Sequence, residues 1–313
     1  MGWPYKPNII QIETVQGCNR RCEFCGTMGI EKKFHFAERK TILHTCKLIR
    51  AAGLNCRILL AGHGEPTLHP HIAEIVADIR KLLPRNMIHL FTNGTVIEKR
   101  PELVLALFDA GVNDLIFDEY SDHRVGDFVR GNHICWMFPI VEQRAGVPLF
   151  AGKNHTERRI CIVPPIDGEG NTTSRKLNNH CGAGMEPLGT AMKSKCSIIF
   201  RDFFIRWDGN IAICCNDFRG EYSVTNIRHC ARLEEAYFHK RLESARKFLI
   251  RGDRAAVYPC SVCNVRAIRP GLLPDSAGKV KLGLPTGDDK MIVKLRKEPL
   301  AIIEKRKWEA KDD

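Results

Sequence analysis

One short stretch organises this chain: residues 18–25, with the sequence CNRRCEFC, place three cysteines at C-x3-C-x2-C spacing. Cys18, Cys22 and Cys25 can close on one metal cluster, but cysteine thiolates hold [4Fe-4S] clusters in fours. The trio therefore leaves one iron open for an exchangeable partner, as catalytic metal sites require. Taken alone, the trio also fits a zinc knuckle or a set of unligated core thiols.

Phe24, directly before the last cysteine, completes a resemblance to the radical S-adenosylmethionine (SAM) superfamily, whose loop has an aromatic residue there. The resemblance implies that the open iron chelates the amino and carboxylate groups of SAM, with Phe24 as a contact. An electron from the cluster would then cleave SAM to methionine and a 5′-deoxyadenosyl radical, which abstracts hydrogen from a substrate carbon. It also implies an electron donor such as flavodoxin or ferredoxin.

Composition limits the class of protein. The 313 residues suffice for one large domain and one small one, and no apolar run approaches the roughly 18 residues of a membrane span. The first residues lack an apolar signal segment, so we expect a cytoplasmic protein whose 14 cysteines are metal ligands and reduced thiols rather than disulfides. The net charge of +12 suggests an anionic partner.

Alternation of strand and helix patterns predicts a parallel α/β sheet. With the resemblance, we expect a partial (β/α)6 TIM-like barrel whose catalytic groups lie at the carboxyl ends of its strands. Strands are predicted over residues 8–15, 56–61, 87–92, 114–118 and 158–163, and helices over residues 36–52, 71–83, 101–110 and, mixed with other structure, 124–150.

The second predicted strand ends in residues 62–70, GHGEPTLHP, which are similar to the Gly-Gly-Glu-Pro-like motif of the same family. The resemblance implies that Gly64 and Glu65 contact the SAM amino group, since glycine allows close backbone approach and a carboxylate accepts from an ammonium. His63 replaces the commoner glycine, and its role stays open. Thr92 and Asn93 resemble the family's third-strand motif near the ligand. A generic Gly/Pro turn is the alternative for residues 62–70.

Two later segments are expected near the catalytic rim. Residues 119–123, EYSDH, follow the fourth strand and either contact SAM ribose or substrate or form a solvated turn. Residues 167–189 are polar and Gly-rich and predict a long loop over the barrel mouth. Its Cys181 either lines the active site or is a spare thiol.

A second group of cysteines follows residue 195. A β-hairpin is predicted over residues 203–214, because Asp208-Gly209 is a strong turn signal, and a helix over residues 233–249. The order resembles the twitch domain, a shortened SPASM extension, in which four cysteines ligate one auxiliary [4Fe-4S] cluster. The implied ligands are Cys196, Cys214, Cys260 and Cys263.

Two alternatives remain for this second group. The same four thiolates could hold a structural zinc ion. Cys215 could also replace Cys214 as a ligand, although the Gly-x4-Cys spacing from Gly209 favours Cys214.

We therefore expect a radical SAM core over residues 1–190, a twitch/SPASM-like domain over residues 191–265 and a basic tail over residues 266–313. The predicted function is hydrogen abstraction from a small molecule or peptide. The alternatives are the same chemistry on a nucleic-acid base or its appended group, and a non-catalytic zinc-binding nucleic-acid module. The tail is either a solvated surface or a nucleic-acid contact.

Overall fold

The structure, a computed structural model, describes residues 5–120, 123–142, 155–163, 171–172, 175–176, 179–184 and 186–265. The predicted tail lies outside this part of the chain.

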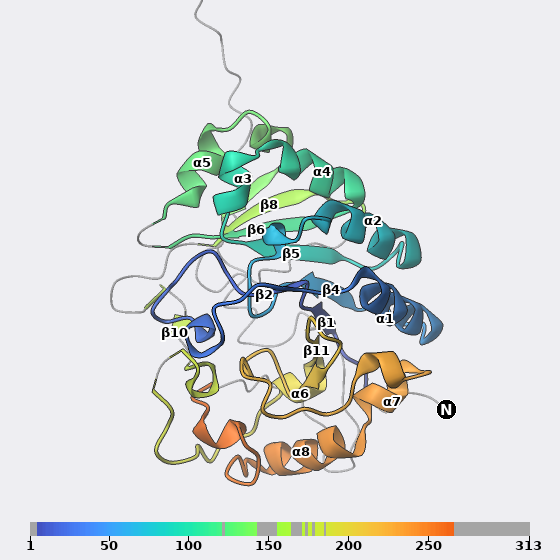
Figure 1. The fold of residues 1–313 in the computed structure, drawn as a ribbon, viewed down its shortest axis with the longest axis vertical. Coiled ribbons are helices and arrows are strands. Elements are labelled where there is room, and N and C mark those ends of the chain that lie inside the picture. The colour runs from blue at the N-terminus through green and yellow to red at the C-terminus, as the bar shows by residue number, and fades with distance from the viewer. Residues whose placement is uncertain are drawn as a thin grey trace, which may run out of the picture.

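One eight-stranded sheet forms the centre of the molecule (Figure 1). Its strand order is β12-β11-β1-β4-β5-β6-β8-β7, and every pair is parallel except β11 with β12. Within the described residues the sheet is open, with β12 and β7 at its edges, as a partial barrel requires. The strands are β1 (Ile9–Ile12), β4 (Arg57–Leu60), β5 (Ile88–Thr92), β6 (Asp114–Asp118), β7 (Ile140–Glu142), β8 (Arg159–Val163), β11 (Asp202–Ile205) and β12 (Ile211–Ala212).

Helices cover one face of this sheet (Figure 1). They are α1 (Arg39–Ala51), α2 (Ile72–Leu82), α3 (Thr95–Lys99), α4 (Glu102–Ala110) and α5 (Val125–Gly131). Alternate strand residues point to opposite faces, so Leu115 and Phe117 join the large core under the helices. Ile116, between them, instead belongs to a small apolar cluster on the other face, with Phe91, Val141, Cys161 and Val163.

The α/β prediction is confirmed, with most strand and helix limits within one or two residues. The helix predicted from residue 36 begins at Arg39, because His35–Phe36 form β3, which pairs with β2 (Val15–Gln16). This antiparallel pair closes the base of the cysteine loop. Short 3₁₀ turns lie inside the loop, η1 (Gly26–Gly29), and after β4, η2 (Pro66–Leu68).

The segment predicted as mixed helical over residues 124–150 contains a strand. After α5 and the 3₁₀ turn η3 (Cys135–Met137), β7 pairs in parallel with β8. Three residues are too few to show a period of two, so the sequence pattern could not reveal β7. Residues 143–150 lie outside the described part of the chain.

Beyond residue 195 the predicted hairpin is present, and its Gly209 has φ of +82°. The first hairpin strand, β11, also pairs in parallel with β1, so the second cysteine region shares the central sheet. The remaining elements are β9 (Asn171–Thr172), β10 (Arg175–Lys176), η4 (His180–Gly182), α6 (Ile198–Arg201), η5 (Ile227–His229), α7 (Leu233–Tyr237), α8 (Lys240–Arg251) and η6 (Cys260–Val262).

The single helix predicted over residues 233–249 is wrong, because the chain forms α7 and α8 with a break between them. Arg246 Nη1 donates to the Tyr237 carbonyl at 2.5 Å, which occupies an acceptor that a continuous helix would use. His239 then caps α8, since its side chain accepts from the Arg241 amide.

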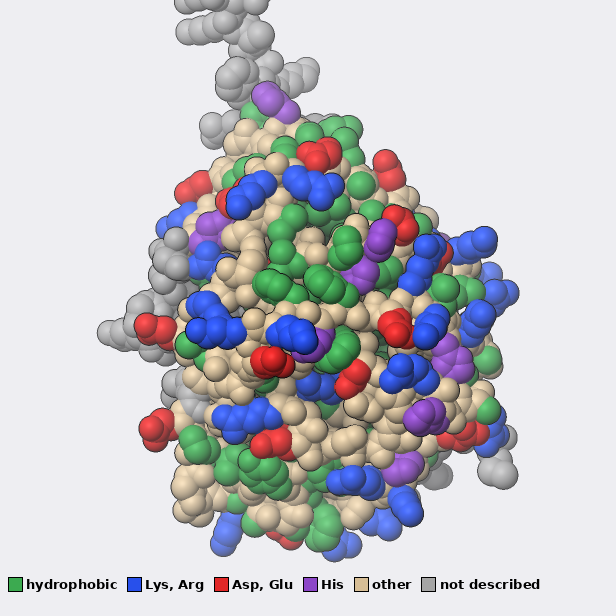
Figure 2. All heavy atoms as spheres, viewed as in Figure 1, with side chains coloured by type: hydrophobic (Ala, Val, Ile, Leu, Met, Phe, Trp, Pro, Cys, Tyr) green, Lys and Arg blue, Asp and Glu red, His purple; other side chains and the backbone are tan. Residues whose placement is uncertain are grey.

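The surface carries mixed charge. On the face shown in Figure 2, Lys and Arg side chains are spread widely, with Asp and Glu between them, and do not gather in one patch. Among the described residues, no helix combines the length and apolar character that crossing a bilayer demands.

Candidate radical SAM and auxiliary cluster sites

The entry to the cysteine loop is fastened to the Gly64 segment. The Gly17 amide donates to the His63 carbonyl at 2.9 Å, and the Glu65 amide donates to the Gly17 carbonyl at 3.1 Å. A β carbon on Gly64 would lie 2.4 Å from two carbonyl oxygens of that entry strand. Gly64 therefore allows a close approach between the chain's own backbones, and its contact with SAM stays a prediction.

The Glu65 carboxylate organises the turns after β4 and β5. Its Oε1 accepts from the Thr67 amide at 3.0 Å, the Thr67 hydroxyl at 2.5 Å and the Thr92 hydroxyl at 2.8 Å, and its Oε2 accepts from the Asn93 amide at 2.7 Å. Burial raises the pKa of Glu65, against the opposing effect of these bonds. A carboxylate has about four acceptor sites. Its described donors thus already give Glu65 a positioning role, and its contact with SAM stays a prediction.

Asn93 connects these turns to the first cysteine. Its Nδ2 lies 3.4 Å from the Cys18 sulfur and donates to Asn19 Oδ1 at 3.0 Å. The Arg20 amide also lies 3.4 Å from the Cys18 sulfur. Cys18, Glu65 and Asn93 therefore meet at the carboxyl ends of β1, β4 and β5, where the catalytic groups of β/α barrels lie.

Phe24, near the end of the loop, packs against Tyr120. The two rings stack with centroids 6.1 Å apart, and the Arg20 guanidinium lies 4.7 Å from the Tyr120 centroid. Burial, followed by nearby acidic groups, raises the pKa of Tyr120. Tyr120, one of the predicted rim residues, thus contacts the cysteine loop. The sequence signal that could have identified Tyr120 is an aromatic residue directly after a predicted barrel strand.

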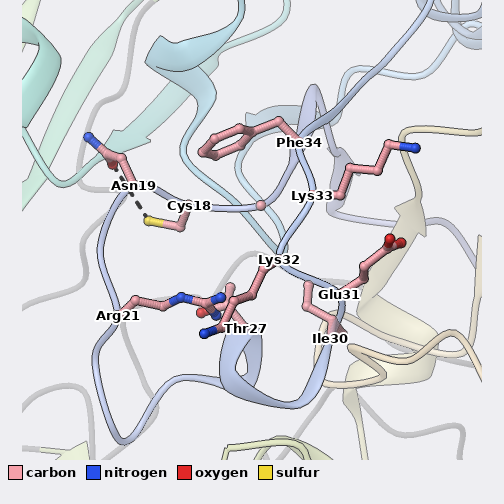
Figure 3. Close-up of a pocket in the computed structure, with 10 residues that line it drawn as sticks. Cys18, Asn19, Arg21, Thr27, Ile30, Glu31, Lys32, Lys33 and Phe34 are labelled. Carbon is pink, nitrogen blue, oxygen red and sulfur yellow. Dashed lines mark hydrogen bonds between the residues drawn. The ribbon is translucent and has the colours of Figure 1, made fainter.

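The cysteine loop surrounds a cavity of about 280 Å³ (Figure 3). Cys18 lies at one side of it. The side chains of Arg21 and Lys32 extend toward each other across its middle, beside Thr27. Two cationic side chains that enter one cavity favour an anionic group there.

A fully buried pair, Glu13 and His63, lies beneath the two motifs. His63 Nδ1 is 3.1 Å from Glu13 Oε1, and the same oxygen accepts from the His63 amide at 2.8 Å. His63 Nε2 lies 2.9 Å from the Cys215 carbonyl, which belongs to the second cysteine region. The residue that replaces glycine in the family motif thus links the two cysteine regions.

The Glu13 carboxylate is held in its charged form. Burial alone would raise its pKa, but His63, Arg206 and the Trp207 amide together lower it below the ordinary value. The Trp207 amide donates to Glu13 Oε2 at 3.0 Å. The sequence did not single out Glu13, although it is the one charged residue of the strand predicted over residues 8–15.

The four predicted auxiliary thiols lie close to one another. Burial first, and then the neighbouring cysteines, raise the pKa of Cys214, and the same causes act on Cys260. Such thiols cannot all ionise together unless a positive group lies between them, as in a thiolate-ligated metal centre.

The ligands of a single metal ion must meet at one point, which is a stricter requirement than that of a cluster. No three His, Cys, Asp or Glu side chains in the described ranges meet at the spacing of ligands to one ion. Ligands of a four-iron cluster bind different irons and need not converge on one point.

Cys214 and Cys215 face different neighbours. After burial, Cys215, Cys260, Cys263 and Cys196 raise the pKa of Cys214, whereas the pKa of Cys215 responds first to Asp202 and Arg201 and only last to Cys196. This arrangement supports Cys214 as the ligand, which stays a prediction.

Cys181 joins the auxiliary thiols, which the sequence did not predict. It is 4% exposed, and Cys263, burial and the thiols of Cys214 and Cys260 raise the pKa of Cys181. Cys181 in turn lowers the pKa of Cys263 to about 7. His180 and Cys181 have φ of +45° and +53°, a left-handed conformation that costs residues with side chains about 1–3 kcal/mol each.

Comparisons with known proteins agree with these two sites. Residues 12–118 match the radical SAM superfamily, and residues 196–264 match an iron-sulfur cluster-binding domain. The chain belongs to the radical SAM superfamily. It is an enzyme of that superfamily with a SPASM-type auxiliary domain, and its cofactors are SAM and iron-sulfur clusters. The residues that hold these cofactors stay predictions.

The chain spans only part of the length of the curated relatives that it matches. The chain is 31% identical over 109 residues to a GTP 3′,8-cyclase of Microcystis aeruginosa, which is 34% of this chain and 32% of that protein. It is 25% identical over 179 residues to the GTP 3′,8-cyclase of Alkaliphilus metalliredigens, covering 51% and 54%.

A solved structure shares the fold over more of the chain. The crystal structure of BtrN in complex with AdoMet and 2-DOIA superposes with a TM-score of 0.65 at 17% identity, covering 84% of this chain and 95% of that one. At this identity the likeness concerns the fold.

Proposed function

We propose that this radical SAM enzyme removes a hydrogen atom from a carbon of a small molecule, with Cys18, Cys22 and Cys25 holding the SAM-binding [4Fe-4S] cluster. A reduced cluster of this type, with SAM bound, supplies the radical that breaks an unactivated C–H bond. The observation that carries the proposal is the gathering of Cys18, Glu65 and Asn93 at the carboxyl ends of three adjacent parallel strands.

The chain's own residues position this chemistry. Asn93 orients Cys18 through its side-chain amide, and Glu65 holds the Asn93 backbone. Tyr120 supports Phe24 near the end of the loop. Together they hold the loop against the sheet edge, where Gly64 and Thr92 are proposed to lie beside SAM.

Four other thiols, Cys196, Cys214, Cys260 and Cys263, are proposed to hold one auxiliary [4Fe-4S] cluster. All four positions around such a cluster would be filled by thiolates, so it could not chelate SAM. We propose that it accepts an electron from the substrate or supports the pocket. An external reductant, such as flavodoxin or ferredoxin, would supply the first cluster.

A small substrate is favoured over a peptide by one observation. The fold matches BtrN, whose solved complex contains AdoMet and 2-DOIA.

The decisive experiment measures SAM cleavage by anaerobically prepared, dithionite-reduced protein. We expect about eight irons per chain and formation of 5′-deoxyadenosine. Cys22→Ala should abolish that product, whereas the matched variant Cys230→Ala, in a buried thiol that donates to the Asn226 carbonyl, should not. Zinc without iron would contradict the proposal, and product from Cys22→Ala would remove Cys22 from the ligand set.

A second candidate is a substrate that carries phosphate, such as a nucleotide or a nucleic-acid base. Arg21 and Lys32 in the loop cavity favour an anion, and the relatives named above are GTP cyclases. Binding of GTP and of single-stranded RNA should be titrated at several salt concentrations, because phosphate contacts make affinity fall steeply with salt. Weak, salt-insensitive binding would exclude this candidate.

A further inference from the structure

A buried arginine lies next to the auxiliary thiols. Arg254 is 2% exposed, so its guanidinium is shielded from water. Its Nε donates to the Ser194 carbonyl at 2.9 Å, and its Nη2 donates to the Lys195 carbonyl at 3.2 Å. The Lys195 carbonyl carbon is bonded to the amide nitrogen of Cys196. The guanidinium therefore lies one peptide unit from a proposed cluster ligand.

The backbone of Arg254 leads to the other end of the site. Its carbonyl accepts from the Val257 amide at 3.1 Å, and the Val257 carbonyl accepts from the Ser261 amide at 2.9 Å. These bonds form consecutive turns that end in the Cys260–Cys263 segment. Arg254 thus holds the chain before Cys196 with its side chain and begins the turns that carry the other ligand pair.

The end of α8 fixes the chain before Cys196 independently of this side chain. The Cys196 amide donates to the Leu249 carbonyl at 3.2 Å, and Lys193 forms an antiparallel bridge with Asp253. The position of Arg254 beside residues 194–196 therefore follows from the path of the backbone as well as from its own hydrogen bonds.

The Arg254 charge has no carboxylate partner among the residues that the structure describes, since its two hydrogen bonds go to neutral carbonyls. Arg246, which is also 2% exposed, differs because its Nη1 lies 2.6 Å from Glu243 Oε1. A buried charge is strongly destabilising unless an opposite charge lies near it. The site of Arg254 therefore requires an anionic neighbour.

A cluster held by four thiolates would supply that anion. Thiolate ligands give such a cluster a net negative charge, which reduction increases, and net charge is one of the factors that set its reduction potential. Burial raises the pKa of the Cys196 and Cys260 thiols, and the Arg254 charge opposes that rise. The charge thus acts on thiols from both ends of the site.

We propose that Arg254 is the buried counter-charge of the auxiliary cluster and that its guanidinium raises the reduction potential of this cluster. A fixed positive charge stabilises the more negative, reduced form more than the oxidised form. Because the site is shielded from water, salt screens this effect only weakly. The inference rests on the auxiliary cluster of the proposed function, but not on the identity of the substrate.

The test compares charged and neutral variants of the anaerobic holoenzyme by a redox titration followed by electron paramagnetic resonance. Arg254→Gln keeps an N–H donor but no charge. It should shift the auxiliary potential to a more negative value, equivalent to a reduced-to-oxidised ratio about tenfold lower, or about 59 mV for one electron. Arg254→Lys keeps the charge and should stay close to the wild type. The control is Arg251→Gln, in an exposed arginine at the end of α8, which should leave the potential unchanged.

Iron content keeps the test decisive if the cluster cannot assemble without the charge. Loss of about four irons from Arg254→Gln, with all irons retained in Arg254→Lys, would also support the counter-charge. Loss of irons from both variants would indicate a purely structural role and overturn the proposal. An unchanged potential in Arg254→Gln, or an equal shift in the two variants, would overturn it as well. Failure of the proposed function is separate, since the wild-type chain itself would then hold fewer than about eight irons or fail to cleave SAM.

Discussion

The two cysteine sites are built in opposite ways. The SAM loop takes its three thiols from eight consecutive residues, and all three are partly exposed. The auxiliary thiols come from Cys196, the end of a hairpin and the turn after α8; Cys260 and Cys263 are buried, and Cys196 and Cys214 are partly exposed and pack against the core. The first site is a local loop at the carboxyl ends of the strands, whereas the second is built into the core. Its metal should therefore contribute far more to folding.

The largest expected effect tests that difference directly. Cys22→Ala and Cys260→Ala should each lose about four irons. Only Cys260→Ala should lower the free energy of unfolding strongly, by more than about 4 kcal/mol, because metal binding free energy at a buried structural site is folding free energy. Anaerobic denaturant titrations of both variants measure this. If Cys22→Ala and Cys260→Ala lowered the free energy of unfolding equally, the proposed difference between the two sites would be wrong.

The next effect concerns the Glu13–His63 pair, which joins the two sites. Glu13→Gln should cost about 3–5 kcal/mol, since removing one partner leaves buried charge uncompensated. The control is Glu142→Gln, whose partly exposed ion pair with Arg130 should be worth under about 1 kcal/mol. A Glu13 variant as stable as this control would show that the pair does not hold the sites together.

The Glu13 pair also predicts a pH dependence. The folded-state pKa of Glu13 is lowered, so its contribution is present above the ordinary value of 4.5 and is lost as pH falls through the folded-state pKa. Anaerobic unfolding from pH 7 to pH 3 should show a smaller acid loss in Glu13→Gln than in the wild type. Parallel curves would exclude Glu13 as a source of the acid sensitivity.

The smallest expected effect concerns Gly64, which contacts the entry of the SAM cysteine loop. Gly64→Ala would press a methyl group against two backbone carbonyls of the loop entry, which should cost about 1–3 kcal/mol. SAM affinity should fall about tenfold, equivalent to 1.4 kcal/mol, because the strand that leads to Cys18 must shift. Gly131→Ala, where a β carbon meets nothing within 4 Å, is the control and should change neither quantity. Unchanged SAM binding in Gly64→Ala would contradict a site at this contact.

Several features escaped sequence analysis for identifiable reasons. β7 has three residues, too short for a period to show. The break between α7 and α8 depends on Arg246, whose side chain takes the Tyr237 carbonyl from nine residues away. Pairing of β11 with β1 joins segments nearly 200 residues apart, and β-propensity does not specify a partner strand.

The sequence by itself determined the class of chemistry, because three thiols within eight residues, and four more around a hairpin and a C-x2-C turn, carry their spacing along the chain. It also determined the order of most strands and helices, since hydrophobic periodicity is local. Only the tertiary structure placed the segment that contains Cys181 beside the Cys260–Cys263 turn, and His63 against Glu13. Those contacts depend on how distant segments pack, and a buried thiol or imidazole has no local signature of the neighbour that it will meet.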